Sequence, residues 1–150
     1  MFLSANQLLK ITGWEVWATS IESNCITFIL KCLDQTADCP VCGSKDNHVH
    51  KVRKVSVRDL ELLDKKTILE LDRHQYYCKG CHKYFTQPSN EIDFRRGMTE
   101  RYKTKILEKI KNSTITHVAN EECLTYDQVT GILESKFEEK KTTSMPEKLV

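Results

Sequence analysis

The chain has 150 residues, 39% of them hydrophobic and 29% charged, which is enough for one ordinary domain or two small ones. Its 23 basic and 21 acidic residues nearly cancel, and no apolar run approaches the roughly 20 residues that cross a bilayer. The N-terminus lacks the basic region and long apolar run of a signal peptide. We therefore expect a cytoplasmic protein that contacts no membrane and whose seven cysteines stay reduced.

Residues 1–33 are predicted to form a short apolar helix followed by a β-hairpin. Hydrophobic and polar residues alternate over residues 14–18 and again over residues 26–30, as expected for two half-buried strands. Cys25 and Cys32 have no partner at metal-ligand spacing. This favours two small, buried apolar side chains over ligands.

Two Cys-x-x-Cys knuckles follow, with thirty-five residues between them. Two such turns can supply the tetrahedral set of thiolates that zinc prefers. Gly43 and Gly80 fit this geometry, because glycine tolerates the positive φ that turns backbone N–H groups toward sulfur. We predict a zinc ribbon with one structural Zn2+ ion, with a redox dithiol or free thiols as the alternatives. The predicted ligands are Cys39, Cys42, Cys78 and Cys81.

The segment between the knuckles is predicted to form two strands. Residues 48–58 are rich in valine and contain no acidic residue, residues 59–66 are expected to turn, and residues 67–77 return as the second strand. Tyr84 and Phe85 are placed to lay a ring against the metal site. The basic residues of the first strand, with which we expect it to contact phosphates, are Lys51, Arg53, Lys54 and Arg58.

Four histidines lie close enough in sequence to replace a cysteine as a zinc ligand. Because four cysteines are already available, we expect each histidine to be exposed or to support the ligands from outside. The four are His48, His50, His74 and His82, and His82 is the first to examine because it adjoins Cys81.

The composition changes after Gln87, and we place a domain boundary there. Apolar residues at helical spacing predict a helix over residues 99–111, with Thr99 as its N-cap. Residues 95–111 contain seven Lys or Arg and two Glu, which makes them a second basic stretch. The residues of this stretch expected to contact phosphates are Arg95, Arg96, Arg101 and Lys105.

Two further helices are predicted over residues 116–122 and 126–137, joined by a turn at 123–125. Their small and aliphatic residues match a helix-turn-helix. Cys123 stands where glycine is more usual, and it is expected to be a turn or core residue and not a ligand. A plain three-helix bundle without DNA contact is the alternative. The matching residues are Val118, Ala119, Cys123, Leu124, Val129 and Ile132.

In a helix-turn-helix, the first residues of the second helix meet base edges in the major groove. Gln128 is suited to bond adenine bidentately, and Thr130 is suited to touch a thymine methyl group. Asp127 would be repelled by phosphates, so we expect it to cap the helix. The predicted base-contacting residues are Thr125, Tyr126, Gln128 and Thr130.

These features occur in a particular order: a Cys-Pro-x-Cys-Gly knuckle, a basic strand ending in Val57-Arg58-Asp59-Leu60, an aromatic pair before the second knuckle, and the helix-turn-helix. This order resembles the N-terminal half of the ISL-three family of bacterial insertion-sequence transposases, from about Leu9 to Phe137. The resemblance implies zinc ligation and binding to the terminal repeats of the element. It also implies a following RNase-H-like domain whose acidic triad holds two divalent metals.

The chain stops about where the first catalytic strand of that family is expected, so no carboxylate triad can be assigned. We therefore expect the chain to be a fragment, a truncated element product or the DNA-binding portion alone. In each case we expect no enzymatic activity. The expected fold class is α+β, a small antiparallel β zinc ribbon with an N-terminal β-hairpin followed by a three-helix helix-turn-helix domain. Its parts are residues 1–87, residues 88–141, and a linker or truncated start of a catalytic domain over residues 142–150.

The leading hypothesis is that the chain is the DNA-binding portion of a transposase-like protein. Its expected partner is double-stranded DNA at terminal inverted repeats, and its expected location is the nucleoid. The zinc would supply folding free energy and no catalysis, because four thiolates leave no open position. One alternative is a zinc-dependent transcriptional regulator or transposition repressor, often a homodimer. A protein-interaction module is another. A thiol redox protein is disfavoured because a redox Cys-x-x-Cys usually opens a helix.

Overall fold

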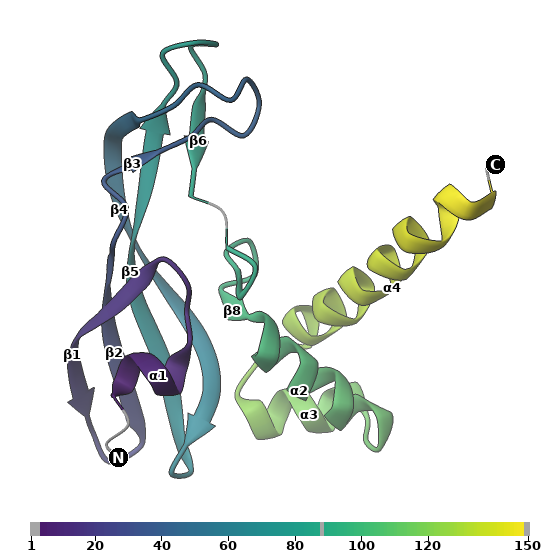
Figure 1. The fold of residues 1–150 in the computed structure, drawn as a ribbon. Helices are drawn as coiled ribbons and strands as arrows, with labels where there is room; N and C mark the ends of the chain where they lie inside the picture. Colours follow the sequence, from purple (N-terminus) through teal and green to yellow (C-terminus); the bar gives the residue numbers. More distant parts are fainter. Residues whose placement is uncertain (1–3, 88, 149–150) are drawn as a thin grey trace. The chain divides into compact units, whose positions relative to one another are not determined.

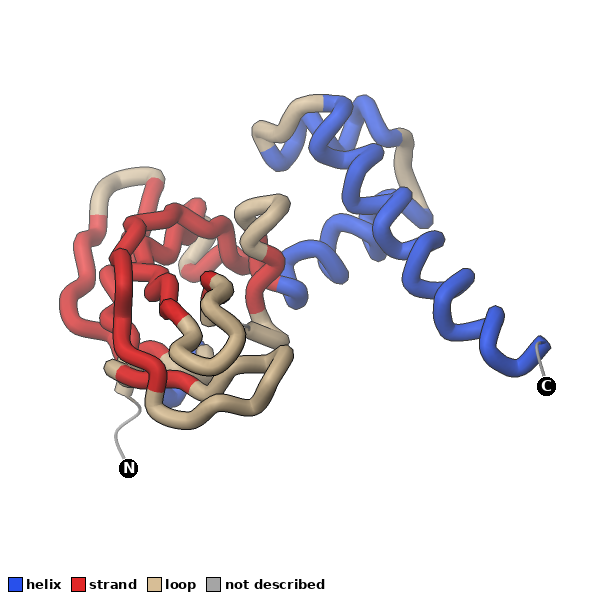
Figure 2. The backbone as a smooth tube through the Cα atoms, turned by 90° about the horizontal axis from the view of Figure 1, so that it is seen from above, coloured by secondary structure: helices blue, strands red, loops and turns tan. Residues whose placement is uncertain are grey.

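The computed structural model describes residues 4–87 and 89–148, with side chains as far as residue 137. The chain divides into two compact units, Met1–Glu100 and Arg101–Val150. The first unit holds a mixed sheet and one short helix, and the second is helical (Figures 1 and 2). The predicted α+β class is confirmed.

The first unit opens with a helix and a hairpin, as the sequence predicts. Helix α1 (Ala5–Leu9) begins with a capping box, in which the Ser4 hydroxyl accepts from the Gln7 N–H and the Gln7 side chain accepts from the Ser4 N–H. Strands β1 (Trp14–Ile21) and β2 (Cys25–Cys32) then pair antiparallel.

Strands β4 (Asn47–Leu62) and β5 (Lys65–Tyr77) form a second, longer antiparallel hairpin. The predicted turn over residues 59–66 is wrong, because only Leu63 and Asp64 separate the two strands. Both have positive φ, 53° and 59°. This conformation at two successive residues reverses the chain tightly and matches the twist of the flanking strands, so no longer loop is needed.

The sheet is mixed, and its strand order is β1-β2-β5-β4-β8-β7. β5 lies beside β2 in parallel pairing, and β8 pairs in parallel with β4. The antiparallel ribbon expected from the sequence therefore describes β4 and β5 but not the whole sheet. Two short strands lie off this path near the upper end of the sheet in Figure 1, β3 (Thr36–Ala37) on β4 and β6 (Tyr84–Thr86) on β5.

The first unit continues past the boundary predicted at residues 87/88. Strands β7 (Ile92–Asp93) and β8 (Met98–Thr99) extend the sheet beyond β4. The buried Thr99 hydroxyl donates to the buried Asp59 carboxylate at 2.8 Å, which fastens β8 to β4. Because this pairing holds residues 92–99 on the sheet, the division falls after Glu100.

The core of the first unit lies on one face of β2 and β5, where alternate apolar side chains point to the same side. Leu30, Leu69 and Leu71 are each at most 1% exposed. Side chains from α1, β1, β4 and β7 complete the cluster. Its buried members are Leu9, Ile11, Trp14, Ile26, Phe28, Leu30, Cys32, Val57, Leu69, Leu71 and Ile92.

The second unit is built from α2 (Glu100–Lys111), α3 (Ile115–Glu122) and α4 (Tyr126–Lys148). The first two bounds lie within one residue of the prediction. The third helix continues to Lys148, so most of the linker predicted at 142–150 is helical, and its last two residues lie outside the described part. Lys and Glu, which fill positions 138–141, are good helix formers.

The apolar faces of the three helices share a small core. Its fully buried side chains are Tyr102, Ile106, Val118, Val129 and Ile132. Among residues 4–87 and 89–148, no helix combines the length and the apolar character needed to cross a membrane.

Candidate metal centre and nucleic-acid surfaces

The four cysteines of the two knuckles form a site that fits zinc. Their sulfur atoms all lie within 4.8 Å of one another, and the separations are 3.8 Å for Cys39 and Cys81 and 3.3 Å for Cys42 and Cys78. Tetrahedral Zn–S bonds of about 2.3 Å place neighbouring sulfurs about 3.8 Å apart. Charge, donor type and spacing therefore all suit one structural zinc ion with no open coordination position.

The two knuckles have the same backbone design. In the first, the Gly43 N–H donates to the Cys39 carbonyl, and in the second, the His82 N–H donates to the Cys78 carbonyl, both at 3.0 Å. In each knuckle an N–H also points at the first sulfur at 3.4 Å, from Val41 in one and from the second cysteine in the other. This repetition aims both pairs of sulfurs at one point.

The predicted role of Gly80 is wrong, because the positive φ of the second knuckle falls on His82 (59°), the counterpart of Gly43 (76°). Gly80 is required for a different reason. A Cβ atom there would lie 3.1 Å from the Cys42 sulfur and 3.2 Å from Ser44 Cβ. Glycine lets the second knuckle approach the first.

This difference predicts unequal effects of two matched substitutions. Gly80→Ala should weaken zinc binding about tenfold or more, because its methyl group pushes the Cys42 ligand away. Gly43→Ala meets no atom within 4 Å and should cost only the strain of a left-handed alanine, about 1 kcal/mol. Competition with a chromophoric chelator measures both affinities. Equal zinc affinities in the two variants would contradict the close-approach argument.

Hydrogen bonds, burial and neighbouring sulfur atoms shift the pKa values of the cluster's thiols in different directions. The N–H of Cys81 lowers the pKa of the Cys78 thiol to about 6. The pKa of the Cys81 thiol is raised to about 11, because burial and the neighbouring thiols outweigh the hydrogen bond from Lys83. Four thiolates this close repel one another, and a divalent cation stabilises them together.

Asn47, the first residue of β4, joins the two knuckles, and sequence reasoning missed it. It is fully buried. Its amide nitrogen donates to the Ser44 carbonyl at 2.9 Å, and its amide oxygen accepts from the Lys79 N–H at 3.0 Å. In the sequence, a polar residue at the start of a strand directly after a knuckle is only a weak indication of a structural role. The fold shows the role, because it brings Asn47 against both knuckles.

None of the four candidate histidines joins the sulfur cluster in the part of the chain that the structure describes. His82 Nδ1 lies 2.8 Å from the Tyr77 hydroxyl, and His74 is buried among polar groups. His48 and His50 are exposed on β4. Phe85, predicted to cover the metal site, stacks on the buried Tyr76 ring at 5.3 Å.

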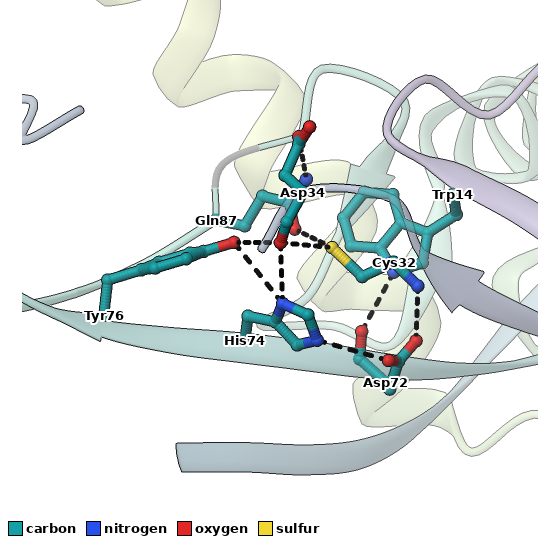
Figure 3. Close-up of polar contacts among 7 residues, drawn as sticks. All are labelled: Trp14, Cys32, Asp34, Asp72, His74, Tyr76 and Gln87. Atoms are coloured by element: carbon teal, nitrogen blue, oxygen red, sulfur yellow. Dashed lines mark hydrogen bonds and ion pairs between the residues drawn. The ribbon is translucent and has the colours of Figure 1, made fainter. Parts of the chain in front are cut away.

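A partly buried polar cluster holds β2, β5 and the segments that follow β2 and β6 together (Figure 3). Cys32, expected to be a plain apolar residue, belongs to it: its thiol donates to Gln87 Oε1 at 2.6 Å, and its N–H donates to Asp72 Oδ1 at 2.7 Å. The members are Trp14, Cys32, Asp34, Asp72, His74, Tyr76 and Gln87.

This cluster contains the group types of a nucleophilic catalyst but not the geometry. The Cys32 thiol contacts Gln87, whereas His74 lies 3.0 Å from the Asp34 carbonyl and 3.3 Å from the Asp72 carboxylate. Burial raises the pKa of the Cys32 thiol, which keeps it protonated and unreactive. The cluster therefore acts as a structural joint.

The basic residues predicted to contact phosphates differ in exposure. On β4, Lys51, Arg53 and Lys54 are exposed, but Arg58 is only 8% exposed. The prediction for Arg58 is therefore not supported, because its position beside β8, where its N–H donates to the Gly97 carbonyl, buries the side chain.

The basic residues of the second basic stretch also differ in their exposure and in their acidic neighbours. Arg95 is exposed, and Arg101 is half-buried. Arg96 Nε lies 4.0 Å from the Asp93 carboxylate, and Lys105 Nζ lies 3.6 Å from that of Glu122. Arg96 and Lys105 thus already have acidic neighbours.

Thr125 caps the start of α4. The expectation that Asp127 is the cap is therefore wrong. Thr125 Oγ1 accepts from the Gln128 N–H at 3.1 Å, and Gln128 Oε1 accepts from the Thr125 N–H at 2.9 Å. Tyr126 is 56% exposed, and the Thr130 hydroxyl donates to the Asp127 carbonyl at 3.0 Å. Asp127 sits in the first turn, where a carboxylate suits the helix dipole.

Comparison with known proteins places the knuckles in a sequence family. Residues 35–81 match the family described as the zinc-finger of transposase IS204/IS1001/IS1096/IS1165. This confirms the resemblance to the N-terminal zinc ribbon of an ISL-three transposase, and it agrees with the cluster of four cysteines. The segment is thus similar to a transposase-type zinc ribbon. No curated protein and no solved structure matched the chain.

Proposed function

We propose that this chain is the DNA-binding portion of a transposase-like protein and recognises duplex DNA at the ends of a mobile element. The match over residues 35–81 supports the transposase-related part of this proposal. The geometry of the turn between α3 and α4 carries the DNA-binding part. In this proposal α3 and α4 form a helix-turn-helix, and the start of α4 reads bases.

The turn between α3 and α4 is short, and backbone hydrogen bonds fix its conformation. Cys123 has φ 58° and ends α3, and the Leu124 N–H donates to the Ala119 carbonyl at 2.9 Å, as in a Schellman motif. The small Ala119 allows close crossing of the helices, and Val129 and Ile132 are fully buried. These are the roles that a helix-turn-helix gives to such positions.

A substitution in this turn tests its geometry. Cys123→Gly should raise the free energy of unfolding by up to about 1 kcal/mol, because glycine adopts the left-handed conformation without the strain of a Cβ atom. Cys123→Ala, the matched control, keeps the Cβ atom and should not stabilise. Urea unfolding followed by circular dichroism measures both. A destabilised Cys123→Gly would contradict the assignment.

Phosphate contacts would come from exposed cations of the first unit. On β4 these are Lys51, Arg53 and Lys54, and near α2 it is Arg95. Neutralising phosphates releases counterions, so affinity should fall steeply as salt increases. Replacing any one of these residues by alanine should weaken binding to all DNA sequences. It should also lower the slope of log affinity against log salt concentration by about 1.

The test of the proposal is a selection of bound duplexes from a random pool. Gln128→Glu is the sharpest variant, because it keeps the oxygen that caps α4 and removes the amide donor that would bind adenine. We expect an altered preference at one or two positions, and none with Thr116→Ala, an exposed control on α3. No duplex binding at low salt, or a preference unchanged by both Gln128→Glu and Thr130→Ala, would overturn base reading by α4.

A further inference from the structure

The ribbon end of the first unit has an open face covered with aromatic rings. We call the four side chains that form it, His50, Tyr77, His82 and Tyr84, the ring face. Ring centroids are 4.8 Å apart for His50 and Tyr84 and 5.2 Å apart for Tyr77 and Tyr84. His82 joins through the hydrogen bond between its Nδ1 and the Tyr77 hydroxyl. All four side chains are exposed, Tyr84 by 54% and Tyr77 by 36%.

Strand alternation explains why these rings face outward. In the pairing of β5 with β6, Tyr76 lies opposite Phe85, and Tyr77 lies opposite Tyr84. The first pair packs on the covered side, where Tyr76 is fully buried. The second pair must point to the other side. The ribbon thus places two partly exposed tyrosines side by side on this face.

The surroundings of the ring face are basic and contain no acidic residue along the chain. Neither residues 48–58 nor residues 73–90 include Asp or Glu. On β4 and β5 the pairing sets Lys51 opposite Gln75 and Arg53 opposite Arg73, next to the rings. In an antiparallel sheet, opposed residues project to the same side, so these cations continue the same face.

Two of these cations have no ion-pair partner among the residues whose side chains the structure describes. Arg53 and Arg73 form no ion pair with any described residue, although two guanidinium groups at opposed positions repel each other. The Arg73 guanidinium lies 4.0 Å above the Phe94 ring, and burial, with the charge of Arg53, lowers its pKa. An anion bound on this face would relieve the repulsion.

We propose that the ring face binds single-stranded DNA, with unpaired bases stacked on Tyr77 and Tyr84 and phosphates held by Lys51 and Arg53. Exposed aromatic side chains beside a basic track are the usual means of binding an unpaired strand without sequence preference. A duplex cannot use such rings, because its bases are already stacked on one another. This site lies in the first unit and does not depend on base reading by α4.

The experiment uses the full zinc-loaded chain and a fluorescent oligothymidylate of about twelve nucleotides, within the length range that such a surface covers. An abasic strand of the same length carries the same phosphates without bases. We expect the oligothymidylate to bind at least about fivefold more tightly than the abasic strand. Equal affinities would mean that only charge is recognised and would overturn the proposal.

Variants assign the binding to the ring face. Tyr77→Ala and Tyr84→Ala should each weaken oligothymidylate binding about fivefold or more, whereas Tyr84→Phe, which keeps the ring, should retain it. Trp17→Ala is the matched control, because Trp17 is a 71% exposed aromatic residue on β1. Zinc content checks that each variant keeps its knuckles. If Tyr77→Ala loses zinc, Tyr84→Ala compared with Tyr84→Phe still decides the question.

The outcomes separate this site from duplex recognition and from a protein partner. Gln128→Glu should leave oligothymidylate binding unchanged, so failure of one proposal does not imply failure of the other. Polyglutamate should compete poorly, because it offers charge without flat bases. If polyglutamate displaces the oligothymidylate at equal charge, or if Tyr84→Ala binds as the unmodified chain does, the ring face is not a site for single-stranded DNA.

Discussion

Replacing both Cys39 and Cys78 by serine is expected to abolish zinc binding and unfold the knuckle end of the first unit. Apparent zinc-binding free energies for such thiolate sites are on the order of 10 kcal/mol, more than any local contact here can replace. The apolar core contains no knuckle residue, and its members come mainly from β2, β5 and the segment around Leu9 to Trp14. The loss of structure should therefore be local.

Metal analysis and amide hydrogen exchange measure this effect. The N–H groups of Gly43 and His82, bonded within the knuckles, should lose protection, whereas those of Leu69 and Leu71 in the core strand should keep theirs. Cys123→Ser is the matched control, since this exposed turn cysteine lies in the other unit. One zinc per chain retained by the double variant would rule out the assigned ligands. Removal of zinc from the unmodified chain by a chelator should reproduce the double variant.

Glu122→Ala is expected to destabilise the helical unit by about 3 kcal/mol, because it removes the anion from a buried network. Glu122 is 1% exposed and accepts hydrogen bonds from the Tyr102 hydroxyl, at 2.9 Å, and from the Lys109 ammonium group. Lys105 Nζ lies 3.6 Å away. Without the carboxylate, these groups lose the buried partner that they share.

The same network makes the stability of this unit depend on pH. Burial opposes the charge of Glu122, but Lys109, Tyr102 and Lys105 outweigh it, so the pKa of this carboxyl is lowered in the folded chain. A lowered folded-state pKa stabilises above the unfolded value of about 4.3, and this contribution is lost as the pH falls through the folded-state pKa. The difference in the free energy of unfolding between the unmodified chain and Glu122→Gln should therefore become smaller as the pH falls.

Urea unfolding of the full chain at a series of pH values, followed by helical circular dichroism, tests both statements. Glu121→Ala is the matched control, because Glu121 is 51% exposed and contacts the same Lys109 at 3.1 Å. A surface pair of this kind contributes at most about 1 kcal/mol. Equal losses for the two alanine variants, or a Glu122→Gln difference that grows on acidification, would contradict the role given to the buried carboxylate.

Much of the local structure could be predicted from the sequence, because it depends on short spacings. The Cys-x-x-Cys pairs identified the metal centre, and period-two alternation identified the first hairpin. Helical periodicity and a turn at Cys123 placed α2 and α3 to within one residue. Each of these signals is complete within a few residues, so no distant part of the chain can alter it.

What only the tertiary structure decided concerns pairing between distant segments. β5 lies between β2 and β4, which draws Cys32 into a polar cluster and brings Gly80 against Cys42. The pairing of β8 with β4 buries Arg58. Alternation alone states that Tyr76 and Tyr77 point to opposite sides of the strand, but not which side is covered. That depends on register and on the segments packed across the sheet. Sequence by itself therefore identified the zinc site, and the fold decided which surface around it stays open.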